Sequence, residues 1–358
     1  MMRGMMPSPL HSLYLRRGAR MGREDGRTVP RLFSNPNAEH RAAAEGCGLF
    51  DISHLSKFAV LGNGALGWLE NLLSNSVTHC HDGMGQSTLL LQPDGGIIDK
   101  LLLFRESAGR FFLLGHGARR AEVFDWLSKH RPEGALELRD ESERLSGFGL
   151  CGPQAEQVLT QVLPGVPLPP PRGFRRLRRG DAPLILLRAS LVGVDAYELF
   201  CPEEAGAGLF EALLAAGATP CGTETRECLR VEHAATAVGR DIGIDKTPVQ
   251  AALERFCDLS KAFVGAEVLR RQSRAGTMHS VAALLCEQGG STPQEGDRLI
   301  DAVGATVGRI TSACLDPEDG QGRALAYVLR RLTYPGTRLR LVAGERRIPV
   351  IVTDTPVC

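Results

Sequence analysis

Aromatic residues, net charge and long apolar runs are all scarce in this 358-residue sequence. Aromatic side chains make up only 5% of the residues and are not interleaved with basic runs, which argues against a stacking surface for single-stranded nucleic acid. The net charge of +1 provides no overall field that would select a nucleic acid or an anionic membrane. No apolar run approaches the ~18–20 residues that span a bilayer. We therefore predict neither a nucleic acid nor a membrane as a partner.

The ten cysteines are scattered along the chain, and no two of them form a CxxC pair. Zinc ribbons and thioredoxin-like motifs need such pairs, so this spacing excludes them. The segment His79-Cys80-His81-Asp82 contains residue types that bind metals, but adjacent residues rarely converge on one ion, and we interpret it as a polar loop. We predict no metal site. Many unpaired thiols suit a reducing compartment, which predicts a cytoplasmic location.

Strand-like and helix-like patterns alternate along the chain and predict an α+β fold in two or three domains. Residues 1–40 are rich in Arg, Gly and Pro and weakly periodic, which predicts an N-terminal arm. Residues 41–270 are predicted as the main domain, made of two α+β lobes with a Pro-rich and then basic connector near residues 163–180. Residues 278–358 show short alternating strands and turns, which predict a small β-sandwich or β-barrel.

A GxGxxG pattern runs from Gly62 to Gly67, between a predicted strand and a predicted helix, as in dinucleotide-binding proteins. The next two strands are joined by the turn Pro93-Asp94-Gly95-Gly96 and form an antiparallel hairpin, whereas a dinucleotide fold needs a parallel strand. The acidic residue at the expected distance, Asp82, lies in a loop and not at a strand end. We therefore assign no nucleotide site.

Asp99 lies in the middle of the predicted strand Ile97–Phe104. Because side chains alternate along a strand, Asp99 shares its face with the apolar residues Ile97, Leu101 and Leu103. An ionisable group in such surroundings is a candidate for a functional site. The alternative is a structural aspartate that is hydrogen-bonded across the sheet.

Glu198 has a similar position, between Ala196 and Phe200 on one face of a predicted strand. A buried carboxylate that accepts two parallel N–H bonds would recognise a guanidine-like edge such as that of a pterin. The alternative is a cross-strand salt bridge.

Arg226 and Arg230 are four residues apart on a predicted helix, Thr223–Ala237, and therefore share one face. Two arginines on one face suit a carboxylate or a polyglutamate tail. The alternative is pairing within the helix, with Glu227 or Glu232.

These residues lie in segments that resemble the glycine-cleavage T-protein (aminomethyltransferase) family along almost the whole chain. Gly95–Asp99 resembles the family segment "GGIxDD", Gly193–Glu198 resembles "GEDGxE", and Arg226–Glu232 resembles "ARDxLRLEAG". Weaker matches are Leu49–His54 with "LFDVSHM", Leu150–Ala155 with "LQGPxA", Lys261–Gly265 with "DFxG", Gly308–Ser312 with "GxVTSG" and Tyr334–Thr337 with "PGT". Each motif is short, but their common order and spacing are specific.

The resemblance implies a three-lobed, cloverleaf-like α+β protein with mixed and antiparallel sheets, folate in a central channel and a small C-terminal β-barrel. It implies one-carbon transfer from a carrier-bound aminomethyl group to tetrahydrofolate with release of ammonia, as in the glycine cleavage system. The partner would be a lipoylated carrier of the H-protein type. By this resemblance Asp99 is the catalytic aspartate, Glu198 binds the pterin and Arg226 contacts folate, and we add Arg230 from the shared helix face.

Several positions depart from the family pattern. Leu191 replaces a tyrosine, His116 replaces an asparagine, and residues 22–36 lack tryptophan and tyrosine. We predict Leu191 and His116 as further cofactor-binding positions. Two alternatives to aminomethyl transfer follow. One is a folate-dependent demethylase or methyltransferase. The other is a non-catalytic folate-binding accessory protein, whose branch carries a "KGCYxGQE" motif, although Lys261–Gly265 lacks that cysteine.

Overall fold

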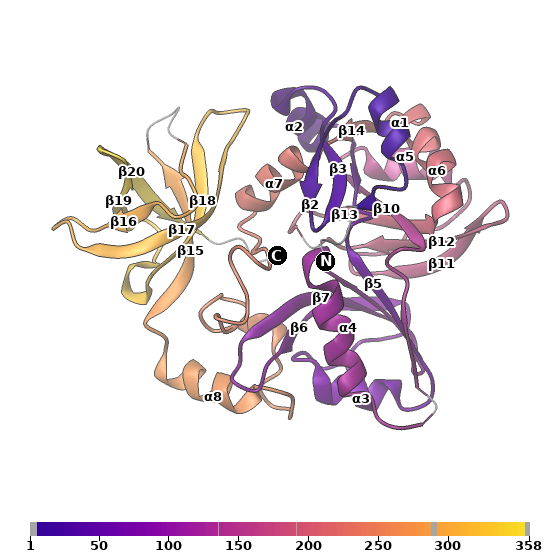
Figure 1. Ribbon diagram of the computed structural model, residues 1–358, viewed down its shortest axis with the longest axis horizontal. Coiled ribbons are helices and arrows are strands. Elements are labelled where there is room, and N and C mark those ends of the chain that lie inside the picture. The colour runs from indigo at the N-terminus through magenta and orange to yellow at the C-terminus, as the bar shows by residue number, and fades with distance from the viewer. Residues whose placement is uncertain (1–5, 135, 191, 288–291, 355–358) are drawn as a thin grey trace. The chain divides into compact units, whose positions relative to one another are not determined.

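The computed structural model describes residues 6–134, 136–190, 192–287 and 292–354, and these have the α+β fold that the sequence predicts. The chain divides into two compact units (Figure 1). The first comprises Met1–Leu90 and Asp99–Arg226, and the second comprises Leu91–Ile98 and Glu227–Cys358. No described helix is long and apolar enough to cross a bilayer.

Two sheets form the framework of the first unit. The five-stranded sheet has the order β6-β7-β8-β5-β9, and the six-stranded sheet has the order β11-β12-β13-β10-β4-β14. The strands of the first sheet are β5 (Ser56–Leu61), β6 (Met84–Leu91), β7 (Ile97–Ser107), β8 (Arg110–Gly115) and β9 (Glu137–Asp140). Those of the second are β4 (Gly48–Asp51), β10 (Leu145–Cys151), β11 (Phe174–Arg179), β12 (Ala182–Arg188), β13 (Ala196–Pro202) and β14 (Thr219–Cys221). The predicted hairpin turn between β6 and β7 is confirmed, since the Gln92 N–H donates to the Gly96 carbonyl at 2.8 Å.

Helices α5 (Ala155–Val162) and α6 (Glu203–Ala215) lie side by side against the six-stranded sheet (Figure 1). The buried side chains of α6 are apolar and belong to one core with Phe148 of β10 and Leu199 of β13. On the other sheet, α3 (Ala65–Leu72) follows β5, and α4 (Arg120–Lys129) follows β8. Both sheets therefore gain a covered apolar face, which fixes the strands that carry the site.

The N-terminal segment is more structured than the arm that its composition predicts. It contains β1 (Met6–Pro7), α1 (His11–Arg16), β2 (Arg20–Glu24), β3 (Arg27–Leu32) and α2 (Pro36–Glu45). Tyr14 of α1 is fully buried, with its ring 5.2 Å from that of Phe210. Asp25 and Gly26 both have positive φ (50° and 78°), as a two-residue hairpin turn of type I′ requires. A single buried aromatic residue and an Asp-Gly turn thus order a segment whose overall composition suggests none.

The strands around the GxGxxG pattern and the basic connector bear on two further predictions from the sequence. The strand before the GxGxxG pattern, β5, pairs antiparallel with β8 and β9, so the described strands form no parallel unit around it. The exclusion of a dinucleotide fold is thereby supported. The basic part of the predicted connector is not a loop, because residues 174–179 form the edge strand β11, which among the described strands pairs only with β12. Arginines on an edge strand hinder further strand pairing.

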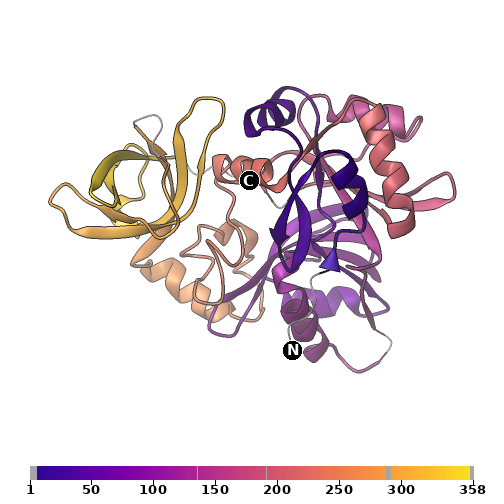
Figure 2. The same ribbon diagram turned by 45° about the horizontal axis from the view of Figure 1, so that its top comes forward.

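The closed barrel of the second unit confirms the predicted C-terminal β-module (Figure 2). Its order is β15-β18-β17-β16-β19-β20, and all pairings are antiparallel. The strands are β15 (His279–Cys286), β16 (Arg298–Ile300), β17 (Thr306–Leu315), β18 (Gly322–Leu329), β19 (Arg338–Ala343) and β20 (Arg346–Thr353). Alternate side chains such as Ala324, Ala326 and Val328 fill the interior. Helix α8 (Ala266–Ala275) precedes the barrel.

Candidate active site

The Asp99 carboxylate is fully buried on β7, as its apolar strand face predicts, and three nitrogen atoms lie within hydrogen-bond distance of it. Oδ1 accepts a hydrogen bond from the Lys100 backbone N–H at 2.8 Å and lies 2.8 Å from Nδ1 of His116. Oδ2 accepts a hydrogen bond from the His116 backbone N–H at 3.0 Å. His116 directly follows β8, the neighbour of β7 in the sheet. The structure therefore brings together two of the predicted site residues.

Glu198 lies in the middle of β13, opposite Gly149 of β10 and Leu187 of β12. It is buried, and within the described chain its Oε2 atom has no hydrogen-bond partner. Burial raises the pKa of Glu198 to about 8, while the positive charge of Arg226 acts in the opposite direction. The cross-strand salt bridge considered as an alternative is not observed among the described contacts of Glu198. Glu198 is therefore a buried carboxyl group in an apolar sheet, and with this pKa it is mostly protonated at pH 7.

Arg226 lies on α7 (Thr223–Glu232), near the N-terminal hairpin and His54. The Glu24 carboxylate Oε1 is 3.9 Å from Nη1 of Arg226 and also 3.9 Å from Nε2 of His54. Burial, followed by the charge of Arg226, lowers the pKa of His54 to about 4, so its imidazole is neutral at pH 7. His54 Nδ1 is buried and lacks a hydrogen-bond partner in the described residues. Arg226 therefore acts on two buried polar groups, Glu198 and His54.

The first turn of α7 is held by Glu39, a fully buried residue of α2. Glu39 Oε2 accepts hydrogen bonds from the Gly222 backbone N–H (2.7 Å) and the Thr225 hydroxyl (2.9 Å). Its Oε1 accepts from the backbone N–H groups of Phe33 (2.6 Å) and Ser34 (2.8 Å). One carboxylate thus connects the N-terminal segment to the turn of helix that carries Arg226.

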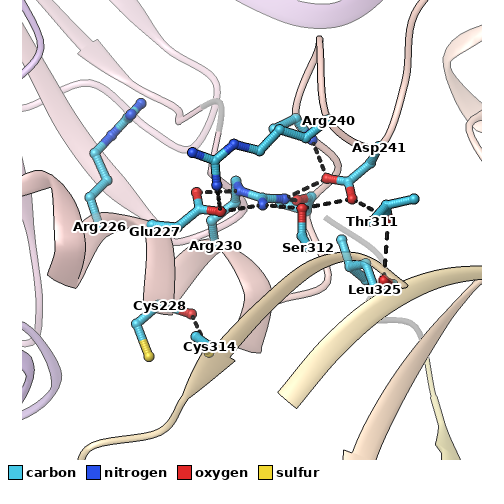
Figure 3. Close-up of polar contacts among 12 residues, drawn as sticks. Arg226, Glu227, Cys228, Arg230, Arg240, Asp241, Thr311, Ser312, Cys314 and Leu325 are labelled. Atoms are coloured by element: carbon cyan, nitrogen blue, oxygen red, sulfur yellow. Dashed lines mark hydrogen bonds and ion pairs between the residues drawn. The ribbon is translucent and has the colours of Figure 1, made fainter. Parts of the chain in front are cut away.

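Arg230 belongs to a separate ion-pair network in the second unit, drawn in Figure 3. Its guanidinium donates to Glu227 (2.6 and 2.8 Å), to Asp241 (2.8 Å) and to the Ser312 hydroxyl (2.7 Å). It is buried, as is Asp241. From the helix spacing, pairing of Arg230 with Glu227 was one alternative to a ligand-binding role, and this pairing is observed. We therefore interpret Arg230 as a structural residue rather than a ligand of an acidic tail.

The remaining predicted positions add little to the description of the site. Leu191 lies outside the described residues. In the loop of residues 79–82, Asp82 forms an ion pair with Arg105 at 2.6 Å, in accord with a polar loop. A cavity of about 230 Å³ opens in the first unit beside Phe112 and Phe200, and none of the predicted site residues lines it. Of the three arginines that line it, Arg110 and Arg176 pair with Glu106, and Arg139 pairs with Glu137.

The sequence reasoning missed His54, Glu24 and Lys57. Lys57 is fully buried, and its ammonium donates to the backbone carbonyls of Ser53 (2.8 Å) and Ser142 (3.1 Å). Burial lowers the pKa of Lys57 to about 7. The contact with Ser53 lies in the loop that carries His54, and the contact with Ser142 ties Lys57 to the segment between β9 and β10. His54 could have been found from its position between two predicted strands. Glu24 could have been found from the Asp-Gly turn that follows it.

Comparison with known proteins gives consistent matches. A model of the GCVT N-terminal domain family matches residues 10–261. A protein of Geobacillus kaustophilus named aminomethyltransferase is 32% identical over 98% of this chain and 97% of its own length. A protein of the same name from Chlorobium luteolum is 31% identical over 94% of this chain and 93% of its own. The crystal structure of glycine cleavage system aminomethyltransferase T from Bartonella henselae superposes with a TM-score of 0.92, at 26% identity, over 99% of this chain and 98% of that one.

Proposed function

We propose, from the premise that this chain belongs to the aminomethyltransferase (glycine-cleavage T-protein) family, that Asp99, Glu198 and Arg226 form its folate site. The chain is an aminomethyltransferase, which passes a one-carbon unit from an aminomethyl donor to tetrahydrofolate and releases ammonia. The roles of individual residues are our proposal, and they follow from the contacts described above.

The buried Glu198 carboxyl is the observation that carries the assignment. A buried polar atom without a partner costs about 1–3 kcal/mol, and a pterin edge offers the N–H groups that would satisfy it. Among the described residues no protein donor meets Glu198 Oε2. Arg226 provides the positive charge that suits the acidic part of folate, and its side chain is only 13% exposed. These residues therefore fit folate in charge and in hydrogen-bonding character.

Tetrahydrofolate, when bound, supplies the nucleophilic amine that accepts the carbon. The protein's part is to orient that amine and to stabilise the positive charge that develops at the reacting centre. Asp99 suits both tasks, because its carboxyl group is buried and its position is held by hydrogen bonds from the backbone N–H groups of Lys100 and His116 and by the contact with His116 Nδ1. Oδ2 accepts only one of these bonds and retains capacity for another donor.

We further propose a lipoylated carrier protein as the donor and the cytoplasm as the location. The Bartonella henselae structure is described as part of a glycine cleavage system, which supports a carrier-borne donor for this chain too. The described cysteines are all free thiols, as a reducing compartment would keep them.

The catalytic assignment is tested with Asp99→Asn, which preserves shape and removes the negative charge. With an aminomethylated lipoyl carrier and tetrahydrofolate, we expect ammonia release to fall by about 10²-fold or more. The control is Asp125→Asn, a change at an exposed aspartate of α4. If Asp99→Asn kept full turnover, the proposal for Asp99 would be wrong.

The pterin assignment is tested without any donor, by calorimetry of tetrahydrofolate binding to wild type and to Glu198→Ala. We expect heat from the wild type and a loss of at least about tenfold in affinity for the variant, since one buried charge-assisted contact is worth about 1.5–3 kcal/mol. Equal heats would remove Glu198 from the site. Turnover of small methylated amines in place of the carrier would instead indicate a demethylase.

A further inference from the structure

The contact between Asp99 and His116 determines which nitrogen of the imidazole carries the proton. Nδ1 of His116 lies 2.8 Å from Asp99 Oδ1. An ionised carboxylate can only accept hydrogen bonds, so Nδ1 must be the donor. In the neutral ring the other nitrogen, Nε2, is then an acceptor with a free electron pair. The second contact, from the His116 backbone N–H to Oδ2 at 3.0 Å, fixes the position of the residue relative to the carboxylate.

The His116 side chain is partly exposed, in contrast to the Asp99 carboxylate that it contacts. The His116 side chain is 16% exposed, whereas Asp99 is 0% exposed. In the part of the chain that the structure describes, no protein group bonds to Nε2. Asp99 can therefore act on a substrate in two ways. It can accept a further hydrogen bond at Oδ2, or it can act through the His116 imidazole that it orients.

We propose that His116 is the proton acceptor of the transfer and that Asp99 orients its ring and stabilises the imidazolium. The inference rests on the proposed function and extends it by assigning the proton transfer to a second residue. As the bond between the folate nitrogen and the carbon forms, an N–H bond of that amine breaks. Its electron pair stays on nitrogen, and its proton passes to Nε2.

The same proton then completes the exchange. The bond between the carbon and the donor's amino group breaks as the bond to the folate nitrogen forms, so the carbon keeps four bonds and the electron pair leaves with the amino nitrogen. His116 returns the proton to that nitrogen, so that ammonia departs and the neutral imidazole is restored. Release from the carrier follows: the bond between the carbon and the carrier sulfur breaks, its electron pair stays on sulfur, and the proton of the second folate N–H moves to that sulfur as the second carbon–nitrogen bond forms. No oxidant or further reactant is needed. A buried anion next to the ring lowers the free energy of the imidazolium throughout this step.

The charged and titratable groups around His116 come from three elements. Asp99 is on β7, and Asp25 is in the turn between β2 and β3, with its Oδ2 atom 3.0 Å from the point where a β-carbon on the next residue, Gly117, would lie. His54 presents its backbone carbonyl to the same residue, and its ring is neutral above about pH 4.

The variant His116→Asn separates the two roles of this residue. An asparagine amide can replace the Nδ1 donor to Asp99, and the backbone N–H remains, but no acceptor corresponds to Nε2. We expect kcat to fall about 10²-fold, with the KM for tetrahydrofolate changed less than about threefold. His79→Asn, at an exposed loop histidine, is the matched control and should retain the wild-type kcat and KM.

A second measurement does not depend on turnover or on the variant's folding. Long-range ¹⁵N–¹H spectra of the wild type report the tautomer of each histidine. We expect a proton on Nδ1 and none on Nε2 for His116 at pH 8. A proton on Nε2, or an unchanged kcat in His116→Asn, would overturn the inference. If Asp99→Asn is inactive while His116→Asn is fully active, only the role of His116 fails. If Asp99→Asn is fully active, the proposed function of Asp99 fails with it.

Discussion

Gly115 passes so close to Asp99 that a β-carbon added to it would lie 2.5 Å from the carboxylate oxygen Oδ2. The same β-carbon would lie 2.7 Å from a methyl group of Leu101 and 2.8 Å from the Ser56 hydroxyl. Real β-carbons are not found at such distances from other atoms. The absence of a side chain at residue 115 is therefore what allows the carboxylate to occupy its place.

Gly115→Ala should for this reason displace Asp99 while leaving its chemistry intact. We expect a stability loss of about 1–3 kcal/mol from overpacking, and a fall in kcat of about tenfold or more. Chemical denaturation and steady-state assays measure the two effects. Gly208→Ala on α6, where nothing lies within 4 Å of the added carbon, is the control and should be neutral or slightly stabilising. A fully active, fully stable Gly115→Ala would contradict the close packing around Asp99.

The raised pKa of Glu198 predicts a pH-dependent affinity for tetrahydrofolate. With a pKa of about 8, Glu198 is mostly protonated at pH 7, and it must lose its proton in order to accept two N–H bonds from a pterin. The Kd should therefore decrease from pH 6 to pH 8, by up to about tenfold per pH unit. Calorimetry in buffers of different ionisation enthalpy should show proton release on binding. Glu198→Gln, which cannot titrate, should show no such trend. A wild-type Kd that is constant over this range would show that Glu198 does not bind as a carboxylate.

The same group should make the protein without substrate less stable as the pH rises. Because the folded-state pKa of about 8 exceeds the ordinary value of ~4.3, the folded state binds more protons than the unfolded state between these pH values. The contribution of Glu198 to the free energy of unfolding is then fully present at low pH and is lost as the pH rises through 8. Glu198→Gln should be the more stable protein at pH 8, by at least about 1 kcal/mol. Urea denaturation at pH 6 and pH 8 tests this, and equal stabilities at pH 8 would argue against a buried, desolvated carboxyl.

Arg230 and Asp241 should stabilise the second unit without contributing to folate affinity. Removal of either partner alone leaves a buried charge, which costs about 3–5 kcal/mol, so we expect Arg230→Met and Asp241→Asn each to be strongly destabilising. The double variant should lose less than the sum of the two single losses, because the two groups interact directly. Folate affinity of the folded Arg230→Met protein should stay within about threefold of wild type. A large loss of affinity at unchanged stability would restore Arg230 as a folate ligand.

Glu39 should influence folate binding from a distance, because it holds the first turn of α7. Glu39→Gln replaces one acceptor oxygen with a donor, so that two of its four hydrogen bonds are lost. We expect a stability loss of about 1–3 kcal/mol and a weaker affinity for tetrahydrofolate through displacement of Arg226. Glu45→Gln, an exposed position on the same helix, is the matched control. Unchanged folate affinity in Glu39→Gln would show that Arg226 is positioned by other contacts.

Much of the architecture is local in origin and could be predicted from pattern. The hairpin around Gly95 and Gly96, the strand that holds Asp99 and the alternating strands of the barrel all follow from periodicity and turn chemistry. The buried environment of Asp99 could be predicted too, because alternation places it among Ile97, Leu101 and Leu103. Motif order then identified the family, which the comparisons confirm.

Other features depend on contacts between residues far apart in the chain. The N-terminal segment is ordered because Tyr14 packs on Phe210, a residue that no local pattern connects with it. Arg226 and Arg230 have the same helix spacing, yet one lies near His54 and Glu198 and the other is saturated by Glu227 and Asp241. Periodicity assigns residues to a helix face, but it cannot say which charges meet that face.

The chemical state of the two acidic site residues, Asp99 and Glu198, also depends on contacts between distant parts of the chain. A carboxylate can be placed on an apolar strand from sequence, since burial there depends on immediate neighbours. Its hydrogen-bond partners depend on which strand lies beside it and in what register. Asp99 acquires the His116 imidazole, and Glu198 acquires no partner within the described chain, only because β7 pairs with β8 and β13 lies between β10 and β12. Strand order is a long-range property, and it turns two similar acidic residues into two different chemical groups.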